Sequence, residues 1–292
     1  MINVRYDAAM ILNKVIFGPV PPRKRQEAED AVENYISVLL HNGQAVGEYF
    51  HVLQNGELCA YVNLAGVNAL SPRYQSTYTA DRLNKIRVLF NQEPKWTTAD
   101  DEVPARDTTW TNAPFLCLYT HMFDWESPLR RGDNGKPIPL YRLPGSHEDH
   151  EAIYFWQRTY RDYDAIWLRC GHLEIPVYRE LALPGSELSQ NGCDICKKVE
   201  SVTGVPTYYF LMRYWGRKEG EERRRCPSCG CAWRTKQPAR QPNSFYDFAF
   251  LCRKCRLVSH MADSCDEPRH ASIGEWQTAK TTKRSPVRLA RP

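Results

Sequence analysis

Long hydrophobic runs are missing from this sequence. No stretch approaches the roughly 18 consecutive apolar residues of a membrane-spanning helix, so no such helix is expected. The first residues, MINVRYDAAMILNKVIFG, lack a basic segment followed by an unbroken apolar one, and Asp7 and Asn13 interrupt them. A secretory signal peptide is therefore not expected either. The location that follows by default is cytoplasmic.

Recognisable catalytic motifs are also absent. The sequence has no glycine-rich phosphate loop and no Gly-x-Ser-x-Gly motif. His147 and His150 are three residues apart, whereas the two zinc-binding histidines of a zincin helix are four residues apart. The HEDHE segment at residues 147–151 is better explained as the acidic start of a helix, where the helix dipole favours negative charge. The sequence therefore favours a protein that is not an enzyme.

The composition is that of a globular protein of one or two domains, with 292 residues, 42% apolar and 25% charged. Its net charge of +5 is unevenly distributed. Residues 1–212 contain 21 Lys and Arg against 26 Asp and Glu, while residues 213–292 contain 18 against 8. A basic C-terminal part suggests an anionic partner, most commonly nucleic acid. A tail that only improves solubility is the alternative.

Helical and strand patterns are mixed along the chain. Apolar residues at helical spacing predict a helix over residues 23–43, and Asn55-Gly56 between two apolar runs predicts a β-hairpin. The other expected elements are a helix over 79–90 with Thr79 as N-cap, a loop over 92–112, a strand over 114–123, a helix from 147 that leads into a strand over 164–170, a helix over 187–203 closed by Gly204, and a core strand over 205–216. This mixture predicts an α+β body over residues 1–215.

Four of the eleven cysteines have the spacing of a metal site. Cys226 and Cys229 form one Cys-x-x-Cys unit, Cys252 and Cys255 form another, and 22 residues separate the two units. This pattern predicts one structural Zn²⁺ bound by four thiolates. Gly230 can supply the positive φ needed to leave the first unit. Residues 216–262 are therefore predicted to form a zinc ribbon; a redox dithiol pair is the alternative.

The sequence around the other cysteines gives less indication of metal binding. Cys59, Cys117 and Cys170 stand alone in apolar runs and are expected to be buried. Cys231 is expected to be a packed side chain, and the nearby Trp233 is expected to cover the metal site or the ribbon sheet. Cys193 and Cys196 share one face of a predicted helix. They lack a partner pair for a second zinc, and a redox role for them stays open.

Basic residues surround the predicted ribbon. If the ribbon folds, it brings them together into a surface suited to phosphate contacts. The alternative is that the negative thiolate site simply attracts nearby cations. The candidate nucleic-acid contacts are Arg223, Arg224, Arg225, Arg234, Lys236, Arg253 and Lys254.

Several motifs together resemble a family of uncharacterised bacterial proteins, described as zinc-ribbon-containing and possibly nucleic-acid-binding. The similar segments are KPIPLYRLP, TGVPTYYFLMRYWG, RRRCPSCGCAW and FYDFAFLCRKCRLVS, with Leu188, Ser189, Cys196 and Glu200 before the second of them. The resemblance implies zinc on Cys226, Cys229, Cys252 and Cys255, and it implies no catalytic residues.

The sequence thus predicts three parts: an α+β body of unknown role over 1–215, a zinc ribbon over 216–262 and a basic, flexible tail over 263–292. The predicted function is non-enzymatic binding of nucleic acid through the basic residues around the ribbon. The alternative is a protein-interaction module, such as an immunity or antitoxin-like protein that neutralises a protein partner. The sequence does not indicate an oligomeric state.

Overall fold

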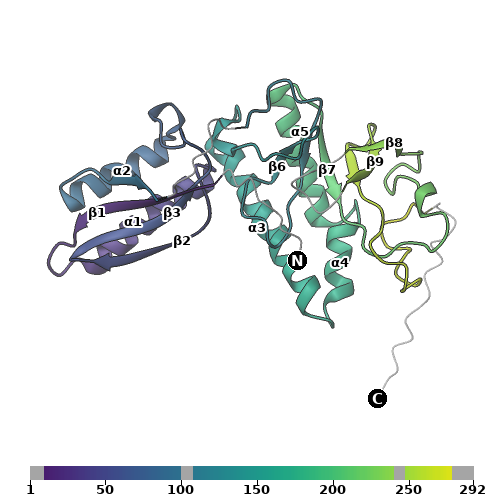
Figure 1. Cartoon of the computed structure of the whole chain (residues 1–292), viewed down its shortest axis with the longest axis horizontal. Helices are drawn as coiled ribbons and strands as arrows, with labels where there is room; N and C mark the ends of the chain where they lie inside the picture. The colour runs from purple at the N-terminus through teal and green to yellow at the C-terminus, as the bar shows by residue number, and fades with distance from the viewer. Residues whose placement is uncertain (1–9, 100–107, 240–246, 278–292) are drawn as a thin grey trace, which may run out of the picture.

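The computed structural model describes residues 10–99, 108–239 and 247–277 of the chain. Helices and strands are mixed throughout, which confirms the predicted α+β class. Figure 1 shows the molecule as an elongated arrangement, with one sheet at one end and strands β8 and β9 toward the other. Helices α3, α4 and α5 lie between these two ends.

The N-terminal unit is a four-stranded antiparallel sheet with two helices. Its strands are arranged in the order β2-β3-β1-β4, and the chain order βαββαβ is that of a ferredoxin-like unit. The elements are β1 (Ile11–Pro19), α1 (Arg25–His41), β2 (Ala45–Gln54), β3 (Glu57–Leu64), a 3₁₀ turn η1 (Pro72–Tyr74), α2 (Thr77–Phe90) and β4 (Lys95–Thr98).

The predicted hairpin is confirmed, because β2 and β3 pair in register around Asn55 and Gly56. Both turn residues have positive φ, at 53° and 83°, as a type I′ turn requires. Helix α1 is confirmed as well. The expected N-cap at Thr79 is wrong: Ser76 caps α2, because its side chain accepts the Thr79 N–H at 3.1 Å.

The loop expected over residues 92–112 contains a strand. Strand β4 pairs with β1, so that Thr97 lies opposite Lys14 and Lys95 lies opposite Ile16. This edge strand has only four residues and is mostly exposed, so it carries no apolar alternation that a sequence pattern could reveal.

The second sheet has six strands in the order β6-β5-β7-β10-β9-β8. Strand β7 runs parallel to both β5 and β10, while the outer pairs are antiparallel. The predicted ribbon segment therefore contributes β8, β9 and β10 to one sheet with the body. The elements are β5 (Leu116–Leu118), β6 (Leu129–Arg131), α3 (His147–Arg169), α4 (Glu174–Ala182), α5 (Glu187–Thr203), β7 (Thr207–Leu211), β8 (Arg234–Ala239), β9 (Phe248–Cys252) and β10 (Leu257–Ser259), with 3₁₀ turns at Leu140–Arg142 and Glu221–Arg223.

Helix α3 begins where the sequence predicts and ends later. Ser146 and Asp149 form a reciprocal capping box, so the HEDHE segment is a helix start. The strand expected over residues 164–170 is wrong, because Asp164 and Trp167 continue the buried face of the same helix. Asp164 also accepts the Met122 N–H at 2.7 Å. Among helices within residues 10–99, 108–239 and 247–277, none has the length and apolar character needed to cross a membrane.

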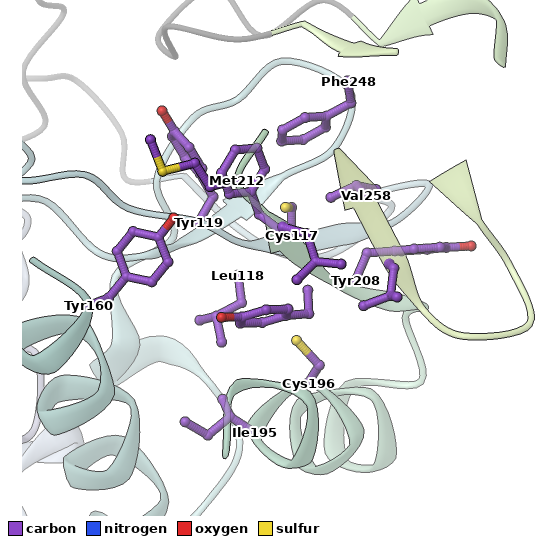
Figure 2. Packing of buried hydrophobic residues seen from close by; sticks show 14 of the residues in the cluster. Cys117, Leu118, Tyr119, Tyr160, Ile195, Cys196, Tyr208, Met212, Phe248 and Val258 are labelled. Atoms are coloured by element: carbon purple, nitrogen blue, oxygen red, sulfur yellow. The ribbon is translucent and has the colours of Figure 1, made fainter. Parts of the chain in front are cut away.

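The larger core lies between β5, β7 and the helices. Figure 2 shows Cys196, from α5, below the sheet side chains and Cys117 among them. Every residue of β7 is buried, which confirms the predicted core strand, and α5 ends at Gly204 with φ 70° as predicted. Burial is confirmed for Cys59 and Cys117, whereas Cys170 is only half-buried.

Candidate metal centre

Four cysteines meet at the end of the second sheet. The sulfur atoms of Cys226, Cys229, Cys252 and Cys255 all lie within 4.8 Å of one another. Tetrahedral coordination with metal–sulfur bonds near 2.3 Å implies sulfur–sulfur separations of about 3.8 Å. The Cys229 and Cys252 sulfurs are 3.7 Å apart. The donor set therefore fits a metal ion bound by four cysteines.

Two tight turns with similar backbone conformation position these sulfurs. In the first, Gly230 follows the second cysteine with φ 70° and donates its N–H to Cys226 O at 2.8 Å. In the other, Arg256 occupies the corresponding position with φ 53°, and Cys255 N–H donates to Cys252 Sγ at 3.4 Å. The positive φ predicted for Gly230 is confirmed. No positive φ was predicted for Arg256, although its position directly after a Cys-x-x-Cys unit matches that of Gly230.

Arg256 is fixed in this uncommon conformation by the body of the protein. Its Nε and Nη2 atoms donate to the two carboxylate oxygens of Glu200, on α5, at 2.9 and 2.7 Å. The hydrogen bond from Arg256 lowers the pKa of Glu200, which also accepts the Thr207 N–H at 3.1 Å. The second turn of the metal centre is therefore attached to both α5 and β7.

Trp233 covers the sheet, as predicted. It is buried, packs against Phe250 with ring centroids 5.2 Å apart, and donates its Nε1–H to Arg224 O at 2.8 Å. The expectation of a packed Cys231 is wrong, since its side chain is exposed. Its carbonyl, rather than its thiol, takes part in the site by accepting the Cys226 N–H at 2.9 Å.

The predicted basic residues divide into an exposed group and one buried residue. The exposed residues are Arg223, Arg225, Arg234, Lys236, Arg253 and Lys254. Two of them are oriented by backbone oxygens: Arg225 donates to Gly230 O at 3.0 Å and Arg234 to Ala249 O at 3.2 Å. Arg253 and Lys254 lie between the cysteines of the second turn. These six residues are called the basic surface below.

Arg224 does not belong to the basic surface, because it is 6% exposed. Its guanidinium lies over the rings of Trp233 and Phe250, at 4.8 and 4.5 Å from their centroids. It donates to Ser259 Oγ at 3.0 Å and to His260 O at 3.2 Å. Burial, and then the nearby positive charge of Arg213, lower the pKa of Arg224 to about 9. A nucleic-acid contact through this side chain is therefore excluded.

A buried ion-pair network joins Arg213, Arg224, Glu221 and Glu275, and no local sequence pattern indicates it. Arg213, two residues after the end of β7, is fully buried and binds both carboxylate oxygens of Glu221 at 2.9 Å. It also donates to Ala271 O at 2.9 Å, Ile273 O at 2.6 Å and Glu275 Oε1 at 3.1 Å. Residues 263–277 were predicted to belong to a flexible tail, but these bonds attach them to the body. Residues 278–292 lie outside the described residues.

Cys196 belongs to the larger core, and Cys193 packs against that core. In the part of the chain that the structure describes, neither belongs to a group of three or more metal-ligating side chains. Burial raises the pKa of Cys193 to about 11 and that of Cys196 well above its ordinary value. Both thiols are therefore held in the protonated form, which is a poor nucleophile.

Three solved structures share a local likeness with this chain. They are Rv0793 from Mycobacterium tuberculosis (15% identity, TM-score 0.27), a conserved protein from Methanosarcina mazei Go1 (15%, 0.28) and SnoaB, a cofactor-independent oxygenase from Streptomyces nogalater (11%, 0.24). The matches cover 33%, 33% and 32% of this chain and 99%, 99% and 95% of those chains. At these TM-scores they support no conclusion about activity.

Three sequence families match successive parts of the chain, and each is described as a domain of unknown function. DUF8589 matches residues 10–100, DUF2310 matches residues 111–212, and DUF8594 matches residues 216–264, which include the four cysteines. Among curated proteins, one "Uncharacterized protein" of Haemophilus influenzae is 35% identical over 53% of this chain and 59% of its own length. Another from the same organism is 32% identical over 67% of this chain and 94% of its own length. The chain therefore belongs to the same family as this second Haemophilus influenzae protein.

Proposed function

We propose that this chain is a non-enzymatic, cytoplasmic binding protein, whose four-cysteine centre holds one structural Zn²⁺ and whose basic surface binds nucleic acid. Zinc is favoured because four thiolates at tetrahedral spacing are its typical structural ligand set. Four protein ligands saturate the ion and leave no position for a substrate or a reactive water. The metal would therefore stabilise the two turns that carry the basic surface.

The charge around the centre carries the nucleic-acid proposal. Residues 223–256 contain nine Lys and Arg but only one acidic residue, Asp247. Of these cations, Arg224 is buried and Arg256 is paired with Glu200. Arg240 lies outside the described residues. The other six cations are the basic surface, which is exposed beside the metal centre and available for phosphate contacts.

The chain separates the three arginines as it leaves the 3₁₀ turn Glu221–Arg223. Arg224 directly follows this turn and points inward onto Trp233 and Phe250. Arg223, the last residue of the turn, and Arg225, which forms an isolated bridge with Ala232, are both exposed. One arginine of the triplet thus stabilises the fold, while the other two are available for binding.

Salt-dependent binding tests the nucleic-acid proposal. The double variant R223A/R225A removes two exposed charges and should reduce the slope of log K against log salt by about 1.8 for duplex DNA, or about 1.4 for single strands. The matched control is K85A/R87A, which removes two exposed charges from α2, at the opposite end of the molecule from β8 and β9 (Figure 1). Fluorescence anisotropy with labelled RNA and DNA at several salt concentrations measures both slopes.

Equal slopes for the two double variants would place the binding surface elsewhere. If neither RNA nor DNA binds at low salt, nucleic-acid binding is refuted, and a protein partner becomes the better hypothesis. The zinc proposal has its own test. Cobalt substitution should give thiolate-to-metal charge-transfer absorption, and the C226S/C252S variant should lose it.

A further inference from the structure

A second group of metal-ligating side chains lies where helix α1 of the four-stranded N-terminal unit meets helix α3. His41 is the last residue of α1, while His147 and Glu151 lie in the first turns of α3. Their ligand atoms all lie within 4.8 Å of one another, and His41 Nδ1 is 2.9 Å from Glu151 Oε1. Two imidazoles and one carboxylate from segments over 100 residues apart thus converge on one point.

The helix geometry and nearby rings hold these donors in place. His147 and Glu151 are i and i+4, so they share one face of α3. The ring of His41 packs against Tyr154 and Phe155, with centroids 4.9 and 5.1 Å apart. The ring of His147 packs against Tyr78 at 4.9 Å. These contacts restrict the imidazole orientations before any ion binds.

We propose that His41, His147 and Glu151 form a second metal site, which takes a divalent transition-metal ion such as Zn²⁺ and clamps α1 onto α3. Two histidines and a carboxylate are a donor set that zinc and ferrous iron use in proteins. A simple ion pair would account for His41 and Glu151 but not for the convergence of His147. Within the described residues, His147 Nδ1 is buried without a hydrogen-bond partner.

The surroundings suit a site that exchanges its ion with solvent. All three side chains are half-buried rather than enclosed. His147 also lines an open cavity of about 420 Å³, together with Tyr74 and Tyr141, which gives an ion a path to the site. Three protein ligands leave one tetrahedral position for water or an external ligand. The bound ion would join the four-stranded unit to the helices that cover the six-stranded sheet.

Metal titration of the full chain tests this proposal. With the four-cysteine centre already loaded with Zn²⁺, isothermal titration with further Zn²⁺ should show one more equivalent, and its binding should raise Tm. Loss of a residue that only supports a ligand typically weakens metal binding 10- to 100-fold. H147Q and E151Q each remove a ligand, so each should weaken the second equivalent by roughly 100-fold or more. The thiolate-bound equivalent should be unchanged in both.

The chain offers a close control in His51. Its Nδ1 lies 3.9 Å from Glu33 Oε1, and its side chain is 24% exposed, as is that of His41. Among the residues that the structure describes, this histidine–carboxylate pair belongs to no group of three metal-ligating side chains. H51Q should therefore keep both equivalents. The proposal is overturned if the wild type binds only the thiolate equivalent, or if H147Q and E151Q, folded by circular dichroism, bind the second equivalent as tightly as H51Q does.

Discussion

Replacing Glu221 by glutamine should destabilise the C-terminal half strongly, because this one carboxylate faces two buried arginines. Both of its oxygens accept from Arg213 at 2.9 Å, and Arg224 Nε lies 3.2 Å from Oε1. Oε2 also accepts the Arg217 N–H at 3.1 Å. The side chains of Arg213, Arg224 and Glu221 are only 0%, 3% and 7% exposed, so water cannot replace the lost charge.

The expected loss in the free energy of unfolding depends on which charges stay buried in E221Q. Removing one partner of a buried ion pair costs about 3–5 kcal/mol, because the other charge stays buried. In E221Q, the two buried guanidinium groups would be left with a single nearby carboxylate, Glu275, which lies 3.1 Å from Arg213 and also binds Arg217. This partial compensation places the expected loss in the free energy of unfolding near the lower limit, at about 3 kcal/mol.

Arg224→Met is the informative comparison. It removes a charge that burial already disfavours and leaves the Arg213–Glu221 pair intact. A methionine can still pack over the two rings, while Ser259 Oγ keeps its hydrogen bond to Leu211 O at 2.8 Å. The lost hydrogen bonds should therefore cost about 1–2 kcal/mol, less than E221Q.

Urea unfolding of the zinc-loaded chain, followed by circular dichroism, measures both variants. Arg223→Met is the matched control, since that side chain is 80% exposed and its loss should change the free energy of unfolding by less than about 0.5 kcal/mol. If R224M is as destabilising as E221Q, or if E221Q is no more destabilising than R223M, then the Glu221 carboxylate does not stabilise the two buried arginines as described.

Three further predictions concern stability. Gly192→Ala would place a Cβ atom 2.1 Å from a carbon of the Tyr209 ring. The resulting overpacking should cost about 1–3 kcal/mol, which exceeds the gain in helix propensity of up to about 1 kcal/mol. The variant should therefore show a lower Tm in a thermal scan. Burial, and then the charge of Arg224, lower the pKa of His260 to about 3. Between this value and the ordinary histidine pKa of ~6.5, His260 is neutral in the folded protein but charged in the unfolded chain. Its contribution to the free energy of unfolding should fall by about 1.4 kcal/mol per pH unit from pH 6 to 4, and H260Q should remove that part of the slope in acid titrations. Gly56→Ala meets no atom within 4 Å but must adopt φ 83°, so chemical denaturation should reveal a backbone cost of about 1 kcal/mol without lost contacts.

Features with short-range causes could be predicted from the sequence. Asn55-Gly56 fixes a turn by the φ values of two adjacent residues, and α1 follows from the spacing of apolar residues within one segment. The four cysteines are similar, since each Cys-x-x-Cys unit already forms half of the site. In each case the physical cause lies within a few residues, where one sequence is sufficient to reveal it.

Features that depend on distant partners could not be predicted. Strand β4 is defined by pairing with β1, about 80 residues earlier, rather than by its own polar residues. Arg224 differs from Arg223 and Arg225 only in the direction of its side chain, which depends on the sheet that it packs against. A run of three arginines therefore looks like one continuous charged patch until the fold separates its members.

The junction between α1 and α3 demonstrates the same limit for function. His147 and His150 lie in one short motif, and their i, i+3 spacing excludes a zincin helix. The fold instead pairs His147 with Glu151 on one helix face and brings His41 to them from the end of another helix. Motif spacing can reveal a site whose ligands lie in adjacent pairs, as at the four cysteines. It cannot reveal one assembled from two units of the fold, because no local sequence constraint connects its ligands.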